Sequence, residues 1–125
     1  MPRIADFHVI QDNNFTLSPS PASDIDQGFD FPLEIGTPLG VASILAFTVT
    51  VPKDVVSSFE VTVNDLLSEK YTYVTPKGPT SYTLHEIISP NKLKALPGVN
   101  NVQFKLKTGS SVQFGDVVLH FQRDI

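Results

Sequence analysis

The chain has 125 residues, of which 41% are hydrophobic, and nine basic against thirteen acidic side chains give it a formal net charge of −4. That length suits one domain, residues 1–125, which buries about two thirds of the surface that its unfolded form exposes. The absence of cysteine excludes disulfides, thiolate zinc sites and cysteine nucleophiles, and it permits a reducing compartment such as the cytoplasm. Acidic side chains outnumber basic ones and no Lys/Arg cluster is present, so we expect neither a nucleic-acid nor a membrane partner.

The N-terminal residues MPRIADFHVI place Asp6 and His8 where a signal peptide needs an unbroken apolar run. No stretch of the chain approaches the roughly 20 apolar residues of a membrane span. We therefore expect neither a signal peptide nor a transmembrane segment, and the sequence leaves the compartment unknown.

The first third of the chain predicts three short strands. Residues Arg3 to Ile10 alternate imperfectly and end in a turn cluster, and Phe15 to Leu17 form a second alternating segment before a proline-rich link. The third strand is expected from Gly28 to Ile35, where the apolar residues occupy odd positions. Pro32 places that strand at a sheet edge or a bulge, because proline cannot donate to a strand ladder.

The middle of the chain predicts four more strands and one short helix. Ser43 to Val51 is a continuous β-prone run, which is typical of a buried strand. Phe59 to Val63 alternates cleanly, and Lys70 to Thr75 and Ser81 to Ile88 follow between proline-containing turns. Ser89 to Pro97 is the one helix candidate, since Ser-Pro at its front resembles an N-cap with proline at the first helical position.

The C-terminal part predicts two strands that pair with each other. Val102, Phe104 and Leu106 alternate with polar residues, which indicates a strand with one buried face. Thr108-Gly109-Ser110 follows, and a glycine among small polar residues supplies the positive φ of a short loop. We therefore expect an antiparallel hairpin that returns at Val112.

The last strand contains a change of parity. Its apolar positions are even up to Phe114 and odd from Val117 onward, and the change falls at Gly115-Asp116. Such a change at a glycine predicts a β-bulge that re-aims the strand. Because Val118 is apolar on the opposite face, the strand is expected in the interior of a sheet.

These features together predict an all-β fold of eight or nine short strands and at most one short helix. Short strands with turn signals about every 8 to 12 residues are the pattern of an antiparallel β-sandwich, jelly-roll-like in type. A β-barrel is the competing architecture.

From Phe47 onward, the order of features resembles the jelly-roll sandwich of galactose-binding-like domains and many carbohydrate-binding modules. The segments that carry the resemblance are FEVTVND, SPNKLKALPGVNNVQF and VQFGDVVLHF, at residues 59–65, 89–104 and 112–121. The resemblance implies a sugar-binding module, in some cases with a structural calcium ion. Such modules usually present aromatic platforms, often tryptophan, and this chain has no tryptophan.

Tyr71, Tyr73 and Tyr82 are therefore the candidate ligand-binding residues. The first two share one face of a strand, and the third lies on the next strand, which could be its hairpin partner. Aromatic rings can stack on the apolar face of a sugar, but aromatic pairs across strands also stabilise sheets without any ligand. Both interpretations remain open.

Asp24, Asp26 and Asp30 are the candidate metal ligands, because three carboxylates around Gly28 could hold calcium on a turning loop. The match to a helix-flanked calcium loop fails, since the closing glutamate is absent. A solvated acidic turn without any cofactor is the alternative interpretation.

No catalytic constellation stands out. His8, His85 and His120 are widely separated, and His85 and Glu86 are neighbours on a strand, so they face opposite ways. The serines lie in no nucleophile elbow. We therefore expect no enzyme but a non-catalytic binding module with carbohydrate as its ligand, or alternatively a structural protein that self-associates into homo-oligomers or a larger particle.

Overall fold

The structure, a computed structural model, describes residues 3–21, 24–32, 42–64, 70–89, 92–93 and 98–124. These residues contain nine strands and no helix, and the helix expected at residues 89–97 lies mostly outside them. The strands are β1 (Arg3–Gln11), β2 (Phe15–Leu17), β3 (Asp26–Pro32), β4 (Ser43–Val51), β5 (Ser58–Val63), β6 (Lys70–Val74), β7 (Thr80–Ile88), β8 (Val99–Thr108) and β9 (Val112–Asp124).

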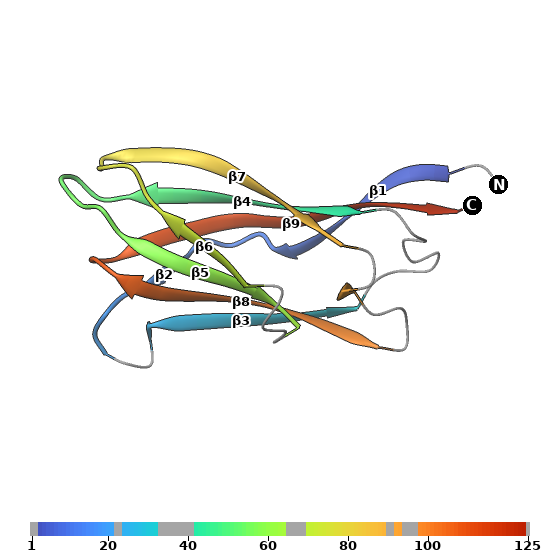
Figure 1. Cartoon of the computed structure of the whole chain (residues 1–125), viewed down its shortest axis with the longest axis horizontal. Helices are drawn as coiled ribbons and strands as arrows, with labels where there is room; N and C mark the ends of the chain where they lie inside the picture. Colours follow the sequence, from blue (N-terminus) through green and yellow to red (C-terminus); the bar gives the residue numbers. More distant parts are fainter. Residues whose placement is uncertain are drawn as a thin grey trace.

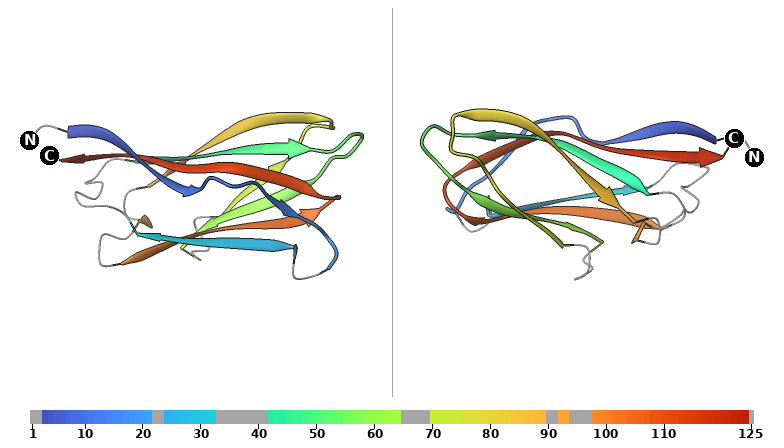
Figure 2. Two further views of the ribbon diagram at one scale, coloured as in Figure 1. Left: turned by 180° about the vertical axis from the view of Figure 1, so that it is seen from behind. Right: turned by 45° about the horizontal axis from the view of Figure 1, so that its top comes forward.

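The strands form two antiparallel sheets that pack face to face (Figures 1 and 2). The β9 sheet has the order β1-β9-β4-β7, with β2 also paired to β9, and the β8 sheet has the order β3-β8-β5-β6. The predicted all-β antiparallel sandwich is confirmed, and its strand order is compatible with a jelly roll. β3 lies at a sheet edge, as Pro32 indicated, and β9 lies inside its sheet.

The predicted hairpin between the last two strands is wrong. β8 pairs with β3 and β5, whereas β9 pairs with β1, β2 and β4, so the loop at Gly109 carries the chain from one sheet to the other. Gly109 does have a positive φ of 95°. Both strands bury alternate residues. This pattern is the same whether a loop joins two neighbouring strands of one sheet or two strands in opposite sheets of a sandwich, so it does not reveal the pairing.

The predicted bulge at Gly115-Asp116 is confirmed. Thr48 of β4 lies opposite Gly115 and Ala46 lies opposite Val118, so one residue of β4 faces two residues of β9. Asp116 takes a φ of 50° there. The extra residue keeps the apolar side chains on both sides of the bulge pointing into the core.

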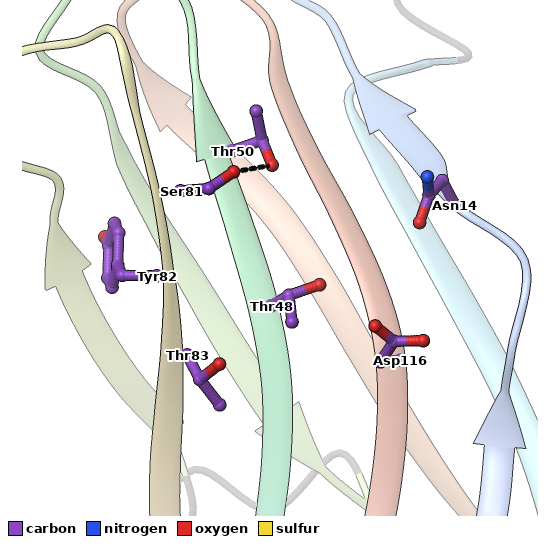
Figure 3. A pocket seen from close by; sticks show the side chains of 7 residues that line it. All are labelled: Asn14, Thr48, Thr50, Ser81, Tyr82, Thr83 and Asp116. Atoms are coloured by element: carbon purple, nitrogen blue, oxygen red, sulfur yellow. Dashed lines mark hydrogen bonds between the residues drawn. The ribbon is translucent and has the colours of Figure 1, made fainter.

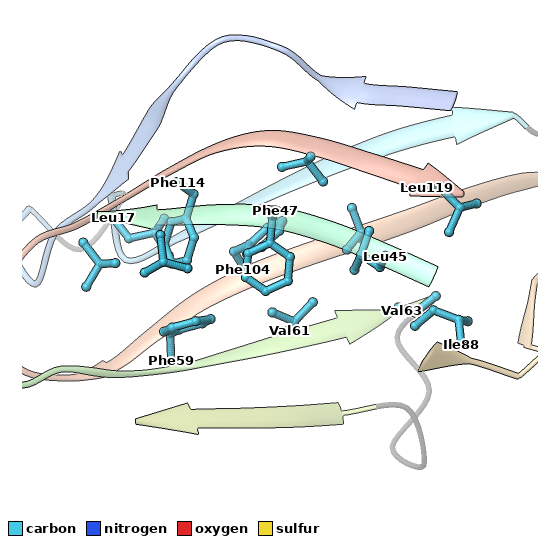
Figure 4. Close-up of a cluster of buried hydrophobic side chains, with 14 of the residues drawn as sticks. Leu17, Leu45, Phe47, Phe59, Val61, Val63, Ile88, Phe104, Phe114 and Leu119 are labelled. Carbon is cyan, nitrogen blue, oxygen red and sulfur yellow. The ribbon is translucent and has the colours of Figure 1, made fainter. Parts of the chain in front are cut away.

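Four buried phenylalanines form the centre of the core, where the two sheets meet (Figure 4). Phe47 and Phe104 lie 5.2 Å apart between ring centroids, Phe104 and Phe114 lie 5.1 Å apart, and Phe59 and Phe114 lie 4.9 Å apart. Tilted and edge-on aromatic packing at such distances adds to the gain from burial alone. Each ring comes from a different strand, so this cluster holds β4, β5, β8 and β9 together.

We predict that Gly109→Ala destabilises the fold strongly. A Cβ atom at this position would lie 2.7 Å from the Val56 carbonyl oxygen and would also meet Ser57, and the backbone has a positive φ. Because backbone atoms must move, the free energy of unfolding should fall by about 2 kcal/mol or more in urea titrations. Gly28→Ala is the control, since the nearest atom there is 3.5 Å away. Equal stability of the two variants would contradict this account.

Candidate functional site

Tyr71 and Tyr73 face inward from β6 and reach β7 in the other sheet. The Tyr73 hydroxyl donates a hydrogen bond of 2.5 Å to Glu86 Oε2, and the Tyr71 hydroxyl donates one of 3.4 Å to the Ile87 carbonyl oxygen. β6 and β7 therefore do not form the suggested hairpin, because they belong to different sheets. Their tyrosines instead connect the two sheets where edge strands of each come together.

Tyr73 is part of the packed interior. Its ring stacks on Phe59 with centroids 5.1 Å apart and also contacts Phe47 edge-on. Burial, together with the hydrogen bond and charge of Glu86, raises the pKa of Tyr73 well above its ordinary value. The hydroxyl stays protonated and remains a donor to Glu86, so this ring is engaged by the protein itself.

The third tyrosine lines an open hollow of about 350 Å³ on the outer face of the β9 sheet (Figure 3). Burial raises the pKa of Tyr82, which lies opposite the buried Val49 and packs its ring against the core, so it borders the hollow from the inward side of β7. The hollow is formed by the outward positions of β4 and β7, the β9 bulge and the segment between β1 and β2. Its lining residues are Asn14, Thr48, Thr50, Ser81, Tyr82, Thr83 and Asp116.

The hollow owes its shape to the bulge. Thr48 Oγ1 donates a 2.9 Å hydrogen bond to the Gly115 carbonyl oxygen, and Thr50 Oγ1 lies 2.6 Å from Ser81 Oγ. A Cβ atom at Gly115 would meet Asn14 and would lie 3.2 Å from Thr48 Oγ1, so only glycine leaves this space open. The result is a group of hydroxyl, amide and carboxylate oxygens that can both donate and accept hydrogen bonds.

Sequence reasoning identified Tyr82 and the bulge but missed the threonines and serine of the hollow. These residues occupy alternate outward positions, at 48 and 50 on β4 and at 81 and 83 on β7. The alternation was visible in the sequence. The pairing of β4 with β7, which places Thr50 opposite Ser81, could not be predicted from the sequence, because β5 and β6 of the other sheet lie between these two strands along the chain.

The three candidate metal ligands lie along the other sheet. Asp26 and Asp30 belong to β3, opposite Lys105 and Asn101, and the Asn101 side chain donates a 2.8 Å hydrogen bond to Asp30 Oδ1. Asp24 precedes the strand and is exposed. In the part of the chain that the structure describes, no group of three His, Asp or Glu side chains could hold a metal ion. The structure therefore does not gather these aspartates into a site.

The histidines also remain apart. His8 faces inward and stacks on Phe31 with centroids 5.7 Å apart, whereas His85 and His120 are exposed on the outer face of the β9 sheet. Glu86 is directed to the opposite face, where it accepts the bond from Tyr73. No pairing of His85 with Glu86 on one substrate follows from this arrangement.

Comparison with protein-family models and with curated protein sequences finds no match for this chain. Within the described residues there is no helix of the length and hydropathy that would let it cross a membrane. The function is therefore inferred from the surface of the sandwich itself.

We predict that Tyr73→Phe lowers the free energy of unfolding by about 1 to 2 kcal/mol, because it removes a donor to a carboxylate in a partly buried position. Tyr71→Phe is the matched control, since its 3.4 Å bond is long and exposed, and it should cost less than about 0.5 kcal/mol. Chemical unfolding of both variants measures the difference. Equal losses would show that the bond to Glu86 does not stabilise the contact between the sheets.

Proposed function

We propose that this protein is a non-catalytic binding module whose hollow on the β9 sheet takes a neutral, polyhydroxylated ligand, in the chemical class of carbohydrates. The observation that carries the proposal is the lining of the hollow, in which threonine, serine and tyrosine hydroxyls are joined by one amide and one carboxylate. A volume of about 350 Å³ is in the range of small-molecule sites.

The chemistry of the lining favours hydroxyl groups over charged ones. Each serine or threonine hydroxyl can donate and accept, which matches the mixed hydrogen bonding of sugar hydroxyls. Asp116 adds an acceptor that can bind two neighbouring hydroxyls of one ring. Among the described residues that line the hollow there is no lysine or arginine, so these residues offer an anionic ligand no partner of opposite charge.

Tyr82 borders the hollow, but its ring lies on the inward side of β7, opposite the buried Val49, and packs against the core, so the polar side chains carry the proposed binding. The resemblance to galactose-binding-like domains and carbohydrate-binding modules supports the same ligand class. Tyr71 and Tyr73, which face β7, have no part in this proposal.

We predict that titration with a panel of neutral mono- and oligosaccharides shifts the backbone amide signals of Thr48, Thr83 and Asp116. Thr83→Val should weaken binding about three- to tenfold, as expected for the loss of one hydrogen bond. Thr72→Val, an exposed threonine on the β8 sheet, is the control and should bind as the unmodified protein does. Absence of shifts with every sugar, or equal effects of the two variants, would refute the proposal.

A further inference from the structure

The outer face of the β9 sheet has a second hollow, with a volume of about 170 Å³. It lies where β1, β9 and β4 run side by side, and the outward side chains that line it are Ala5, Ala42, Ile44, His120 and Gln122. Register places Ala5 opposite Gln122 and Ile44 opposite His120. The hollow described above is called the first hollow below, and both open on the same face of the sandwich.

The second hollow combines two polar side chains with apolar surface. The Gln122 amide and a neutral His120 imidazole can each donate and accept hydrogen bonds, and both side chains are exposed. Ile44, which is 41% exposed, presents aliphatic surface beside them. The ring of Phe7 lies next to that of His120, with centroids 6.4 Å apart. The second hollow can therefore contact both the hydroxyl groups and the apolar C–H face of a sugar ring.

The two hollows complement each other chemically. The outward side chains of the first hollow are hydroxyls, one amide and one carboxylate, which suit the hydroxyl groups of a sugar. Since the Tyr82 ring packs inward, the first hollow gives a sugar little apolar contact. The second hollow adds that contact through Ile44 and the His120 ring.

The outward residues of β4 connect the first hollow to the second. Thr48 lines the first hollow and Ile44 lines the second, and Ala46 is the outward residue between them. In Figure 3 this path continues downward along β4 from Thr48. Ala46 pairs with Val118 and His85 on the neighbouring strands, and its side chain is a single methyl group. So small a side chain forms no ridge between the two hollows.

The separation of the hollows determines how long a ligand must be to reach both. Thr48 and Ile44 are four residues apart on β4, which corresponds to about 13 Å along a strand. A single pyranose ring is too short to cover that distance, whereas several linked rings can cover it.

We propose that the ligand of this protein is a linear oligosaccharide that occupies both hollows at once. This inference rests on the proposed function, because it extends the site that takes the first ring. One ring binds to Thr48 and Asp116 in the first hollow. The chain then follows β4 over Ala46, and a later ring contacts His120 and Gln122 in the second hollow.

Titrations followed by amide chemical shifts test the inference with glucose, mannose and galactose and with their β-1,4-linked oligomers of two to six rings. We expect affinity to rise with chain length, with a tetrasaccharide bound at least about tenfold more tightly than its monosaccharide. Repetition of one ring in the first hollow alone would raise the apparent affinity of a tetrasaccharide no more than about fourfold, because four rings then compete for one site.

The outcomes separate this inference from the proposed function. A monosaccharide that binds in the first hollow, with a gain of fourfold or less for its tetrasaccharide, would overturn the inference and leave the proposed function intact. No binding of any monosaccharide or oligosaccharide would refute the proposed function itself, and the inference with it.

Gln122→Ala tests the second hollow directly. It should weaken tetrasaccharide binding about three- to tenfold, as expected for the loss of one hydrogen bond, and leave monosaccharide affinity unchanged. Gln103→Ala is the matched control, because it makes the same change on the outer face of the β8 sheet, and it should leave both affinities unchanged. Equal tetrasaccharide affinity of the two variants would overturn the inference.

A second variant covers the case in which Gln122→Ala fails to fold, as judged by circular dichroism. His120→Ala removes the ring from the second hollow and should also weaken tetrasaccharide binding while monosaccharide affinity stays the same. In the unmodified protein, the tetrasaccharide should shift the amide signals of Ile44 and Gln122, and the monosaccharide should not. Undiminished tetrasaccharide binding by His120→Ala, or no shift at these two residues, would also overturn the inference.

Discussion

The packing of Phe47, Phe59, Phe104 and Phe114 between the two sheets is the interaction on which the rest of the structure depends. Each ring occupies an inward position of its strand, and side chains alternate along a strand, so the neighbouring positions must face outward. The surfaces of the sandwich are therefore consequences of the core. Placing Phe47 inward also places Ala46 and Thr48 on the outer face of the β9 sheet, where Thr48 lines the hollow.

The bulge in β9 connects this core to the proposed site. Without the extra residue, alternation would turn Val117, Leu119 and Phe121 outward, although all three are buried. The bulge absorbs that shift and leaves Gly115 without a side chain beneath Asn14, with Asp116 exposed at the rim. One local irregularity thus keeps β9 in the core and opens the hollow, which fits the frequent occurrence of bulges next to functional sites.

Strand positions, the bulge and the interior place of β9 could be predicted from the sequence, because each depends on the alternation of neighbouring residues. Pairing could not be predicted in this way. The sequence predicted a hairpin at Gly109, but this loop joins strands of different sheets. It also suggested that Tyr71 and Tyr73 form a ligand platform, whereas their hydroxyls reach across to β7. The hollow depends on the pairing of β4 with β7 and β9, which are distant in the chain.

The central claim is that the hollow on the outer face of the β9 sheet is the ligand-binding site that we propose. Amide chemical shifts recorded during titration with neutral oligosaccharides test it most directly. We expect the shifts to gather at Thr48, Thr83 and Asp116, while Glu60 and Lys105 on the other sheet remain unchanged. Shifts confined to the β8 sheet, or none with any sugar, would contradict the claim.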